Sequence, residues 1–538
     1  MPTNRSSILQ RTVILLRNQT AGMLAGTAVC LALATTVKAQ VSPDALLDKL
    51  VAKGILKPGE ADEIRNEAST NNAKGLNFKL SGAIKSMELY GDVRMRYEYR
   101  SAQLGQEAGQ YAGAYDTANR WRYAIRLGVR GDLADDFYYG LRLETGPGER
   151  STFNTFGNAS GGQSPYYGPF SKANNYSLYI GQAYLGWRPT SWLDVSIGRV
   201  PQPLYTTPMV WDSDYCPEGA VEKIRFTDAS VDYFATFCQY VYQDTTPSSA
   251  YAVEGGESAN YFLGDFSDQN AYLLAWQAGG TYHLDTNISF KVAPIVYNYI
   301  GHGNQSSGFY GPFVGQGING FTFNTNSTAS SSTFPGGSGV TSGPNVTTSS
   351  YNQTGINNLA IIEFPMELNF KIGSLDARAF GDFSINLEGD DRARAAYAAG
   401  EAIAHVGGNP NPFPGGVQLN QSQAMQFGLA VGNNLGLVYG TESKKGTWEA
   451  RAYWQHVEQY ALDPNLLDSD TFEGRGNLQG IYAALAYSFS DAMIGSLHYG
   501  WAERINNQLG TGGFNSDLPL PNPINKFQLF QVDVTWRY

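Results

Sequence analysis

The segment GDVRMRYEYR at residues 91–100 alternates between two kinds of side chain. Its odd-numbered residues from Val93 to Tyr99 are apolar or aromatic, whereas every even-numbered residue from Asp92 to Arg100 is charged. Successive side chains of a β-strand point to opposite sides. The segment therefore predicts a strand with one apolar face and one densely charged face.

The same two-residue period continues in the segments that follow, from Trp121 to Val129 and from Tyr139 to Glu144. A soluble sandwich and a membrane barrel both produce such alternation, because either a second sheet or lipid can cover the apolar face. Three features favour the barrel. The candidate strands run to about nine to fifteen residues, longer than is usual in soluble sheets. Aromatic residues cluster near strand ends, and short turns alternate with long polar loops.

The predicted fold is therefore all-β, a transmembrane antiparallel β-barrel over residues 76–538 with about sixteen strands and a range of about 14–18. Composition agrees, since 34 Tyr, 27 Phe, 9 Trp and 61 Gly suit a large β protein and argue against disorder. The final segment alternates again and ends on the aromatic Tyr538. A last strand of this kind resembles the signal read by the barrel-assembly machinery of outer membranes.

The N-terminus predicts export. Three arginines precede an apolar run from Ala21 to Val37, so residues 1–39 read as a signal peptide cleaved after Ala39, with a retained membrane anchor as the alternative. Cleavage would remove four basic residues and no acidic one, leaving 33 basic against 48 acidic residues and a net charge of −15. An acidic exported chain is not expected to bind nucleic acid.

Residues 40–75 predict a periplasmic amphipathic helical hairpin. Ser42 and Pro43 suit the start of a helix, and Leu46, Leu47 and Leu50 recur at helical spacing. So short a piece buries little apolar surface alone, so the hairpin would need a partner or self-association, and a linker with transient helix is the alternative.

The chain from Ala45 to Tyr538 resembles the putative porin family of Gram-negative outer membranes in its alternating pattern and in the order of several local sequence matches. The local matches are Leu46–Leu56, Glu88–Tyr97, Ile197–Arg199 followed by Trp211–Asp214 and Pro217–Gly219, and the late group Trp448, Tyr453 and Val457–Glu458. The resemblance implies a diffusion channel, and homotrimers are common among porins of this size. The Ser/Thr/Gly-rich loop at 301–355 has no counterpart that the resemblance explains.

Eight arginines on three consecutive strands would all face away from lipid, where each would cost about 2–4 kcal/mol near the midplane. The predicted pore-lining residues are Arg94, Arg96, Arg100, Arg120, Arg122, Arg126, Arg130 and Arg142. A proline-stiffened segment that starts at Pro201 carries Asp212, Asp214 and Glu218 and is predicted to fold inward as a constriction loop. Carboxylates would then face guanidiniums across an aqueous gap, or the arginines would pair with acids on their own wall. If the arginines dominate the narrowest section, anions are weakly preferred.

Cys216 and Cys238 would both survive export, and the sequence leaves open whether they form a disulfide or stay separate thiols. No cofactor, metal site or catalytic residue is predicted, because the five histidines lack ligand spacing and no nucleophile elbow occurs. The predicted function is an outer-membrane porin for passive diffusion of small hydrophilic solutes and ions. A closed or plugged barrel with an adhesive or structural surface role is the alternative, and a barrel hydrolase is a third hypothesis.

Overall fold

A computed structural model gives the structure of the chain. The residues that it describes are 81–105, 113–146, 151–156, 178–243, 271–301, 359–392, 421–440, 442–463, 465–507, 511 and 524–538. The predicted signal peptide at 1–39, the helical hairpin at 40–75 and nearly all of the loop at 301–355 lie outside these residues.

The chain divides into two compact units, one formed by Met1–Met87 with Gly131–Asp136 and the other by Glu88–Arg130 with Phe137–Tyr538. In the first unit, the described residues form a short pairing in which Ile84 bridges Leu133. The Lys85 amide donates a hydrogen bond to the Asp132 carbonyl oxygen at 2.9 Å. The one-turn segment η2 (Ala134–Asp136) completes this unit, with Asp135 in the left-handed region at φ 57°.

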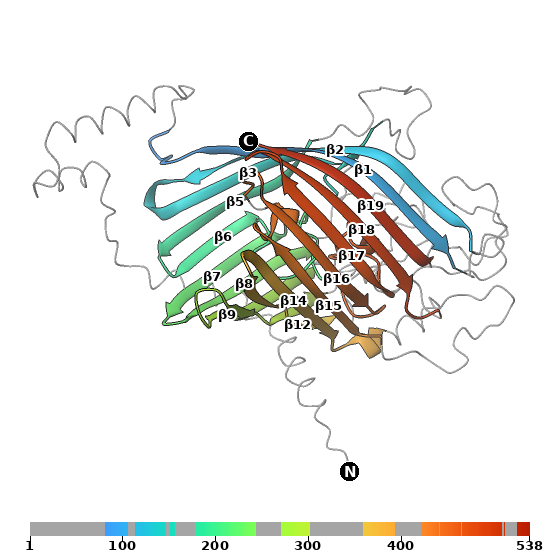
Figure 1. Cartoon of the computed structure of the whole chain (residues 1–538). Helices are drawn as coiled ribbons and strands as arrows, with labels where there is room; N and C mark the ends of the chain where they lie inside the picture. Colours follow the sequence, from blue (N-terminus) through green and yellow to red (C-terminus); the bar gives the residue numbers. More distant parts are fainter. Residues whose placement is uncertain are drawn as a thin grey trace, which may run out of the picture. The chain divides into compact units, whose positions relative to one another are not determined.

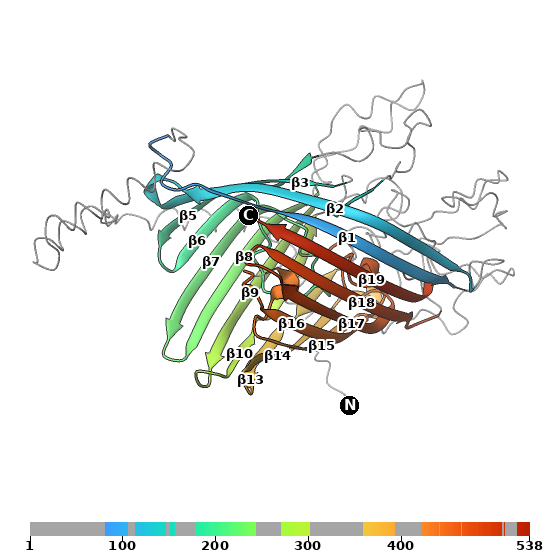
Figure 2. The same cartoon turned by 45° about the horizontal axis from the view of Figure 1, so that its top comes forward.

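The second unit is a closed antiparallel barrel of 16 strands, which confirms the predicted all-β barrel (Figures 1 and 2). Closure comes from β19 (Ile524–Arg537), which pairs with β1 (Glu88–Leu104) from Asp92↔Arg537 to Leu104↔Ile524. Closing the sheet leaves its first and last strands no free edge. From β5 onward each strand pairs with its neighbours in chain order.

Nineteen strand labels describe these 16 strands, because two strands are interrupted and β4 is only a two-residue segment that pairs with β2. The interruptions fall at Pro294 and Pro365, where proline supplies no backbone N–H to the ladder. The other strands are β2 (Tyr115–Asp132), β3 (Phe137–Thr145), β4 (Asn154–Thr155), β5 (Leu178–Thr190), β6 (Leu193–Arg199), β7 (Glu218–Asp228), β8 (Val231–Gln243), β9 (Ala271–His283), β10 (Ser289–Val292), β11 (Ile295–Gly301), β12 (Ala360–Glu363), β13 (Met366–Ile372), β14 (Leu375–Asn386), β15 (Gln423–Gly432), β16 (Trp448–Val457), β17 (Leu478–Ser488) and β18 (Met493–Arg504). Two further one-turn segments are η8 (Leu437–Tyr439) and η9 (Phe472–Gly474).

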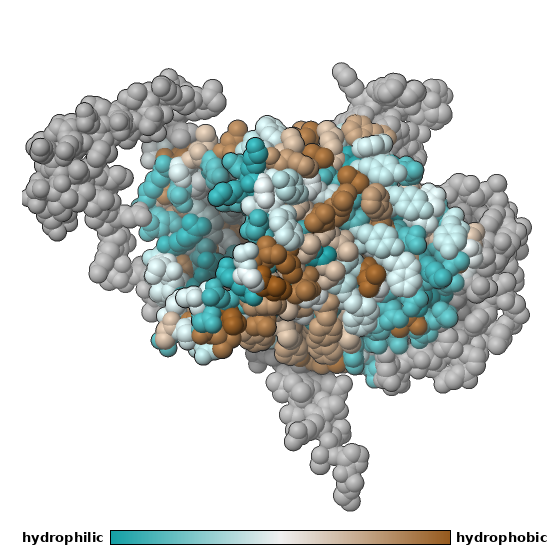
Figure 3. Space-filling model, in the orientation of Figure 1, coloured by the Kyte–Doolittle hydropathy of each residue, from teal (hydrophilic) through white to brown (hydrophobic). Residues whose placement is uncertain are grey.

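The outer face of the barrel carries the apolar half of each alternating strand. Trp121, Ile197 and Phe226 are each more than half exposed, as are other large apolar side chains on the same face. Figure 3 shows brown, apolar residues across the middle of the visible wall and teal, hydrophilic residues toward both its left and its right side. Within the described segments, no helix has the length and apolar character needed to cross a membrane.

The inner face is not uniformly polar. Two loops, Val200–Pro217 between β6 and β7 and Glu458–Asn477 between β16 and β17, contribute apolar side chains to a buried cluster with inward residues of the wall. Met209 is fully buried and Trp211 is 2% exposed in this cluster. One part of the lumen is therefore filled by an apolar core, and this core fixes both loops.

Candidate functional site in the barrel lumen

All eight predicted arginines have inward register positions on β1, β2 and β3, and each one forms an ion pair. The pairs and their N···O distances are Arg94–Asp92 2.9 Å, Arg96–Asp533 2.8 Å, Arg100–Glu98 3.1 Å, Arg120–Glu98 2.6 Å, Arg122–Glu98 3.6 Å, Arg126–Asp214 2.5 Å, Arg130–Glu88 2.6 Å and Arg142–Glu144 2.7 Å. Most partners lie on the same wall, so much of the positive charge is compensated locally.

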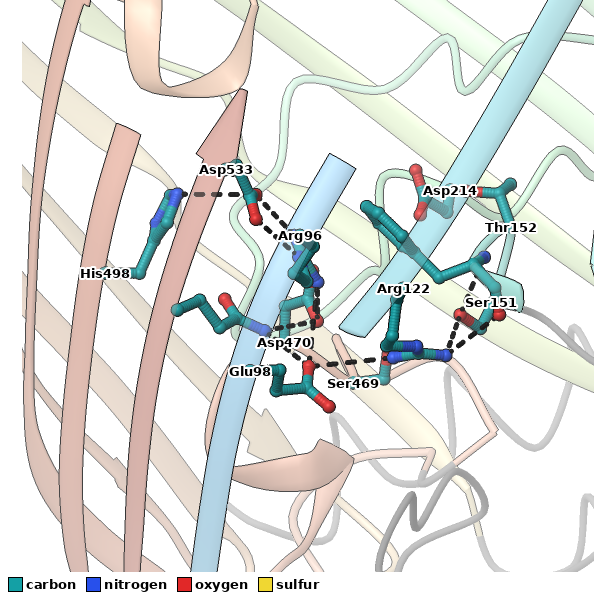
Figure 4. Close-up of polar contacts among 12 residues, drawn as sticks. Arg96, Glu98, Arg122, Ser151, Thr152, Asp214, Ser469, Asp470, His498 and Asp533 are labelled. Carbon is teal, nitrogen blue, oxygen red and sulfur yellow. Dashed lines mark hydrogen bonds and ion pairs between the residues drawn. The ribbon is translucent and has the colours of Figure 1, made fainter. Parts of the chain in front are cut away.

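Arg96 is the centre of the densest part of this network. Its Nε donates to Asp533 at 2.8 Å, and its Nη1 donates to both carboxylate oxygens of Asp470 at 2.9 and 2.8 Å. Figure 4 shows Arg96 between these two carboxylates, with Glu98 beside them. Asp470 belongs to the loop Glu458–Asn477, so Arg96 ties that loop to the joint between β1 and β19.

The eight arginines differ in the exposed fraction of their side chains. The side chains of Arg96, Arg100 and Arg122 are at most 4% exposed, so almost none of their surface is accessible to solvent. Arg94 and Arg120 keep about a fifth of their side-chain surface accessible, and Arg130 keeps about half. The assignment of these eight arginines as pore-lining residues stays a prediction.

The loop Val200–Pro217 extends across the lumen to the opposite wall. The hydroxyls of Tyr205, Thr206 and Thr207 donate hydrogen bonds to carboxylates of β13, β12 and β14. The distances are 2.8 Å for Tyr205 to Glu367, 2.6 Å for Thr206 to Glu363 and 2.5 Å for Thr207 to Asp382. Glu363 and Asp382 are at most 1% exposed, so these hydroxyls satisfy carboxylates that would be costly to bury alone.

The three predicted carboxylates of this loop have different positions. Asp214 pairs with Arg126 on β2. Burial raises the pKa of Asp214, but the attraction of Arg126 and Arg94 outweighs burial and lowers this pKa to about 2. Asp212 accepts hydrogen bonds from the amides of Asp214 and Ser469 and therefore links the two loops.

Glu218 lies outside the loop. It is the first residue of β7, in register with Arg199 of β6, and the two side chains form an ion pair at 3.0 Å. Its side chain is 61% exposed, because the strand pairing that begins here turns it away from the loop. The inward segment therefore carries two carboxylates rather than three.

The inward folding of the second loop, Glu458–Asn477, was not predicted. The long segment between two clearly alternating strands was a sequence signal that could have indicated it. Its leucines join the apolar cluster, and Asp463 accepts hydrogen bonds from Tyr242 and Tyr299, each at 2.9 Å. Burial raises the pKa of Asp468 well above its usual value, and the nearby Asp212 and Asp470 raise it further. Burial and the neighbouring acids thus favour the neutral form of this carboxyl group over its charged form.

Cys216 and Cys238 are free, buried thiols in the structure. Of the two possibilities that the sequence left open, the structure has separate thiols and no disulfide between these two residues. Cys216 lies beside Arg142 and Gln182, whose side-chain nitrogens approach its sulfur at 3.6 and 3.5 Å. Cys238 lies on β8 opposite Val221 of β7. Burial raises the pKa of the Cys216 thiol, so this thiol is less reactive than an exposed one.

The lumen thus places guanidiniums on β1–β3 and carboxylates on β12–β14, with a hydroxyl-rich loop between them. Such an arrangement can orient water and polar solutes. Among the residues described, no group of three or more His, Cys, Asp and Glu side chains is placed to hold a metal ion.

A family model described as putative porin matches residues 110–538, in agreement with this architecture. Among solved structures, the chain is similar to the anion-selective porin from Comamonas acidovorans, with 11% identity, 84% of this chain and 99% of that chain covered, and a TM-score of 0.36. It is also similar to OmpF of Salmonella typhi in complex with daunomycin, with 9% identity, 84% and 97% covered, and a TM-score of 0.39. No curated protein matches the sequence.

Proposed function

The chain belongs to the putative porin family, and from this membership we propose that it forms a water-filled channel in the bacterial outer membrane for passive diffusion of small hydrophilic solutes and ions. One observation carries the proposal. A closed barrel with an apolar outer face holds a hydroxyl-rich loop between an arginine-rich wall and a carboxylate-rich wall. A protein interior without water would not normally retain so many charged groups.

Transport by diffusion needs no covalent chemistry, so the proposed channel is not an enzyme. The constriction would be the space left beside the loop Val200–Pro217. Solutes passing there would meet accessible cations such as Arg94 and Arg120. A transverse field of this kind favours polar over apolar solutes.

The test is conductance of the purified, refolded protein in a planar lipid bilayer. Stable ohmic steps, followed by a reversal potential in a salt gradient, are expected. The matched control is the same protein kept unfolded in urea and added at equal concentration. Ohmic steps that occur with the unfolded control and not with the refolded protein would count against a channel.

A second function has its own support in the structure. The buried apolar cluster fills part of the lumen, as expected for a plugged barrel with an adhesive or structural role. The protein could give no conductance steps in the bilayer although its circular dichroism shows a folded barrel. That result would favour this function over the channel. Trp211→Ala in that silent protein would then be expected to produce leak, because it removes the largest side chain that the loop contributes to the cluster.

We also propose that the protein forms homotrimers, supported by polar residues on its outer face. Glu222 of β7 and Gln239 of β8 occupy the face opposite to the buried Val221 and Cys238, and they hydrogen bond at 2.9 Å. Polar side chains within a lipid-facing band are unfavourable, and contact with a second subunit would shield them. Chemical cross-linking in micelles should give a trimer band, and Glu222→Lys should reduce that band if this face is the contact. Monomers only would refute this proposal.

A further inference from the structure

Three lumen cations differ from the arginines of β1–β3 because, among the described residues, no carboxylate pairs with them. Lys223 and Arg225 on β7 and Lys291 on β10 make no ion pair and no side-chain hydrogen bond in the part of the chain that the structure describes. The register places all three on the inner face, since Lys223 lies opposite the buried Thr236 and Lys291 lies opposite Thr281.

These three cations line one cavity of about 690 Å³. Pro203 and Tyr205 of the loop Val200–Pro217 bound it on one side, and Trp192 of the short turn between β5 and β6 bounds it on the other. The cavity therefore lies on the short-turn side of the constriction. Its size falls within the range of small-molecule sites.

The acids around this cavity are engaged elsewhere. Glu367 accepts a hydrogen bond from Tyr205 at 2.8 Å and pairs with Arg378 at 3.6 Å. Asp194 accepts a hydrogen bond from Tyr138 and pairs with Arg188 at 3.3 Å. Asp232, the one carboxylate in the cavity lining, is bound to Thr227 and His283 at the rim. The cavity keeps an excess of positive charge that its own wall does not neutralise.

Aromatic rings accompany these cations. The Nζ of Lys291 lies 3.5 Å from the ring centroid of Tyr205 and 5.3 Å from that of Phe234. These cation–π contacts hold the ammonium group in position while leaving its N–H donors without an acceptor. Trp192 is 50% exposed and adds a further ring surface to the lining.

We propose that this cavity is a binding site for small aromatic carboxylates. The unpaired ammonium and guanidinium groups would bind the carboxylate through charge-assisted hydrogen bonds. The ring of the ligand would pack against Phe234 and Trp192, where edge-to-face or offset contacts between rings are favourable. The inference rests on the proposed channel, because it assigns the channel a solute class that dwells just inside the constriction.

The test uses benzoate as the probe, added to the folded full-length protein in a bilayer bathed in potassium chloride. Benzoate should lower the open-channel current with a half-effect concentration at least tenfold below that of acetate, which carries the charge without the ring, and of benzyl alcohol, which carries the ring without the charge. The double variant Lys223→Gln/Lys291→Gln should abolish that tenfold preference. Lys371→Gln, which changes an exposed lysine already paired with Asp376, should preserve it.

Failure of the proposed binding site and failure of the proposed channel would give different experimental results. Open steps whose current responds equally to benzoate and acetate would overturn the site while leaving the channel intact. A response to inorganic phosphate as strong as to benzoate would also overturn it, because charge alone would then suffice. If no steps occur, calorimetric titration of benzoate into the protein in micelles decides the site separately. Binding that is weakened tenfold in the double variant supports the site, and absence of binding refutes it.

Discussion

The ion pair between Asp214 and Arg126 gives the sharpest prediction, because it joins the loop Val200–Pro217 to β2 through one defined contact. The side chains are 21% and 10% exposed, so water screens the pair only in part. Replacing the aspartate by asparagine keeps the size of the side chain and removes its charge. We expect Asp214→Asn to loosen the loop and to leave Arg126 with an uncompensated charge.

The magnitude follows from the titration of Asp214, whose pKa falls from its ordinary 3.8 to about 2 in the folded protein. One pKa unit corresponds to about 1.36 kcal/mol, so the folded state favours the charged carboxylate by about 2 kcal/mol. Because the folded pKa is lowered, this stabilisation is present above about pH 4 and is lost as the pH falls toward 2.

The assay is urea unfolding of the refolded protein in detergent micelles, followed by tryptophan fluorescence. Asp214→Asn should lower the free energy of unfolding at pH 7 by about 2 kcal/mol, and the gap to the unmodified protein should close between about pH 4 and pH 2. Asp376→Asn is the control, because its pair with Lys371 is nearly half exposed and such pairs contribute about 0–1 kcal/mol.

Two results would refute this reasoning. One is an Asp214→Asn protein within about 0.5 kcal/mol of the unmodified protein at pH 7, the spread usual for surface substitutions. The other is a gap between the two proteins that stays constant down to pH 2. A double variant with Arg126→Gln separates the pair from its surroundings, since the coupling between the two substitutions should account for most of the loss.

Three further predictions concern the loop Val200–Pro217 and the two cysteines. Trp211→Ala should cost about 3–5 kcal/mol and raise single-channel conductance, because a large buried side chain anchors the constriction loop to the apolar cluster. Thr207→Val should destabilise the protein by about 1–3 kcal/mol in the same unfolding assay, because it leaves Asp382 buried without that donor. Maleimide labelling of Cys216 and Cys238 should be slow in the folded protein and complete in urea, as mass spectrometry would show, and finding the two thiols already joined would contradict the structure.

The sequence predicted the inward direction of side chains well, because strand parity is a local property. Once Val93 and Met95 face lipid, Arg94 and Arg96 must face the lumen. The same parity would have identified the buried acids Glu363 and Asp382, since each alternates with outward neighbours on its strand. Glu363 was not predicted because Pro365 interrupts the alternating pattern directly after it.

Contacts between distant segments could not be predicted in the same way. Asp470 is 374 residues from Arg96 in the sequence, yet the two side chains form an ion pair at 2.8 Å. Only closure of the barrel brings the start of the chain beside its end and leaves room for the loop Glu458–Asn477 to fold inward. Local patterns carry no information about which loop reaches which wall.

In the proposed channel, the apolar cluster would link pore width to stability. A solvated constriction loop could change its sequence freely, but Val200–Pro217 buries Met209 and Trp211 against the wall and satisfies carboxylates on three strands. Substitutions that widen the pore by removing loop side chains therefore also remove buried contacts, and they destabilise the fold. Selectivity is easier to change at positions that support nothing else. Lys223 and Arg225 are such positions, since no ion pair of the described barrel depends on them, whereas Lys291 also contacts the ring of Tyr205. Changes in solute preference are therefore expected to arise at Lys223 and Arg225 at little cost in stability, whereas changes at the paired arginines should affect folding first.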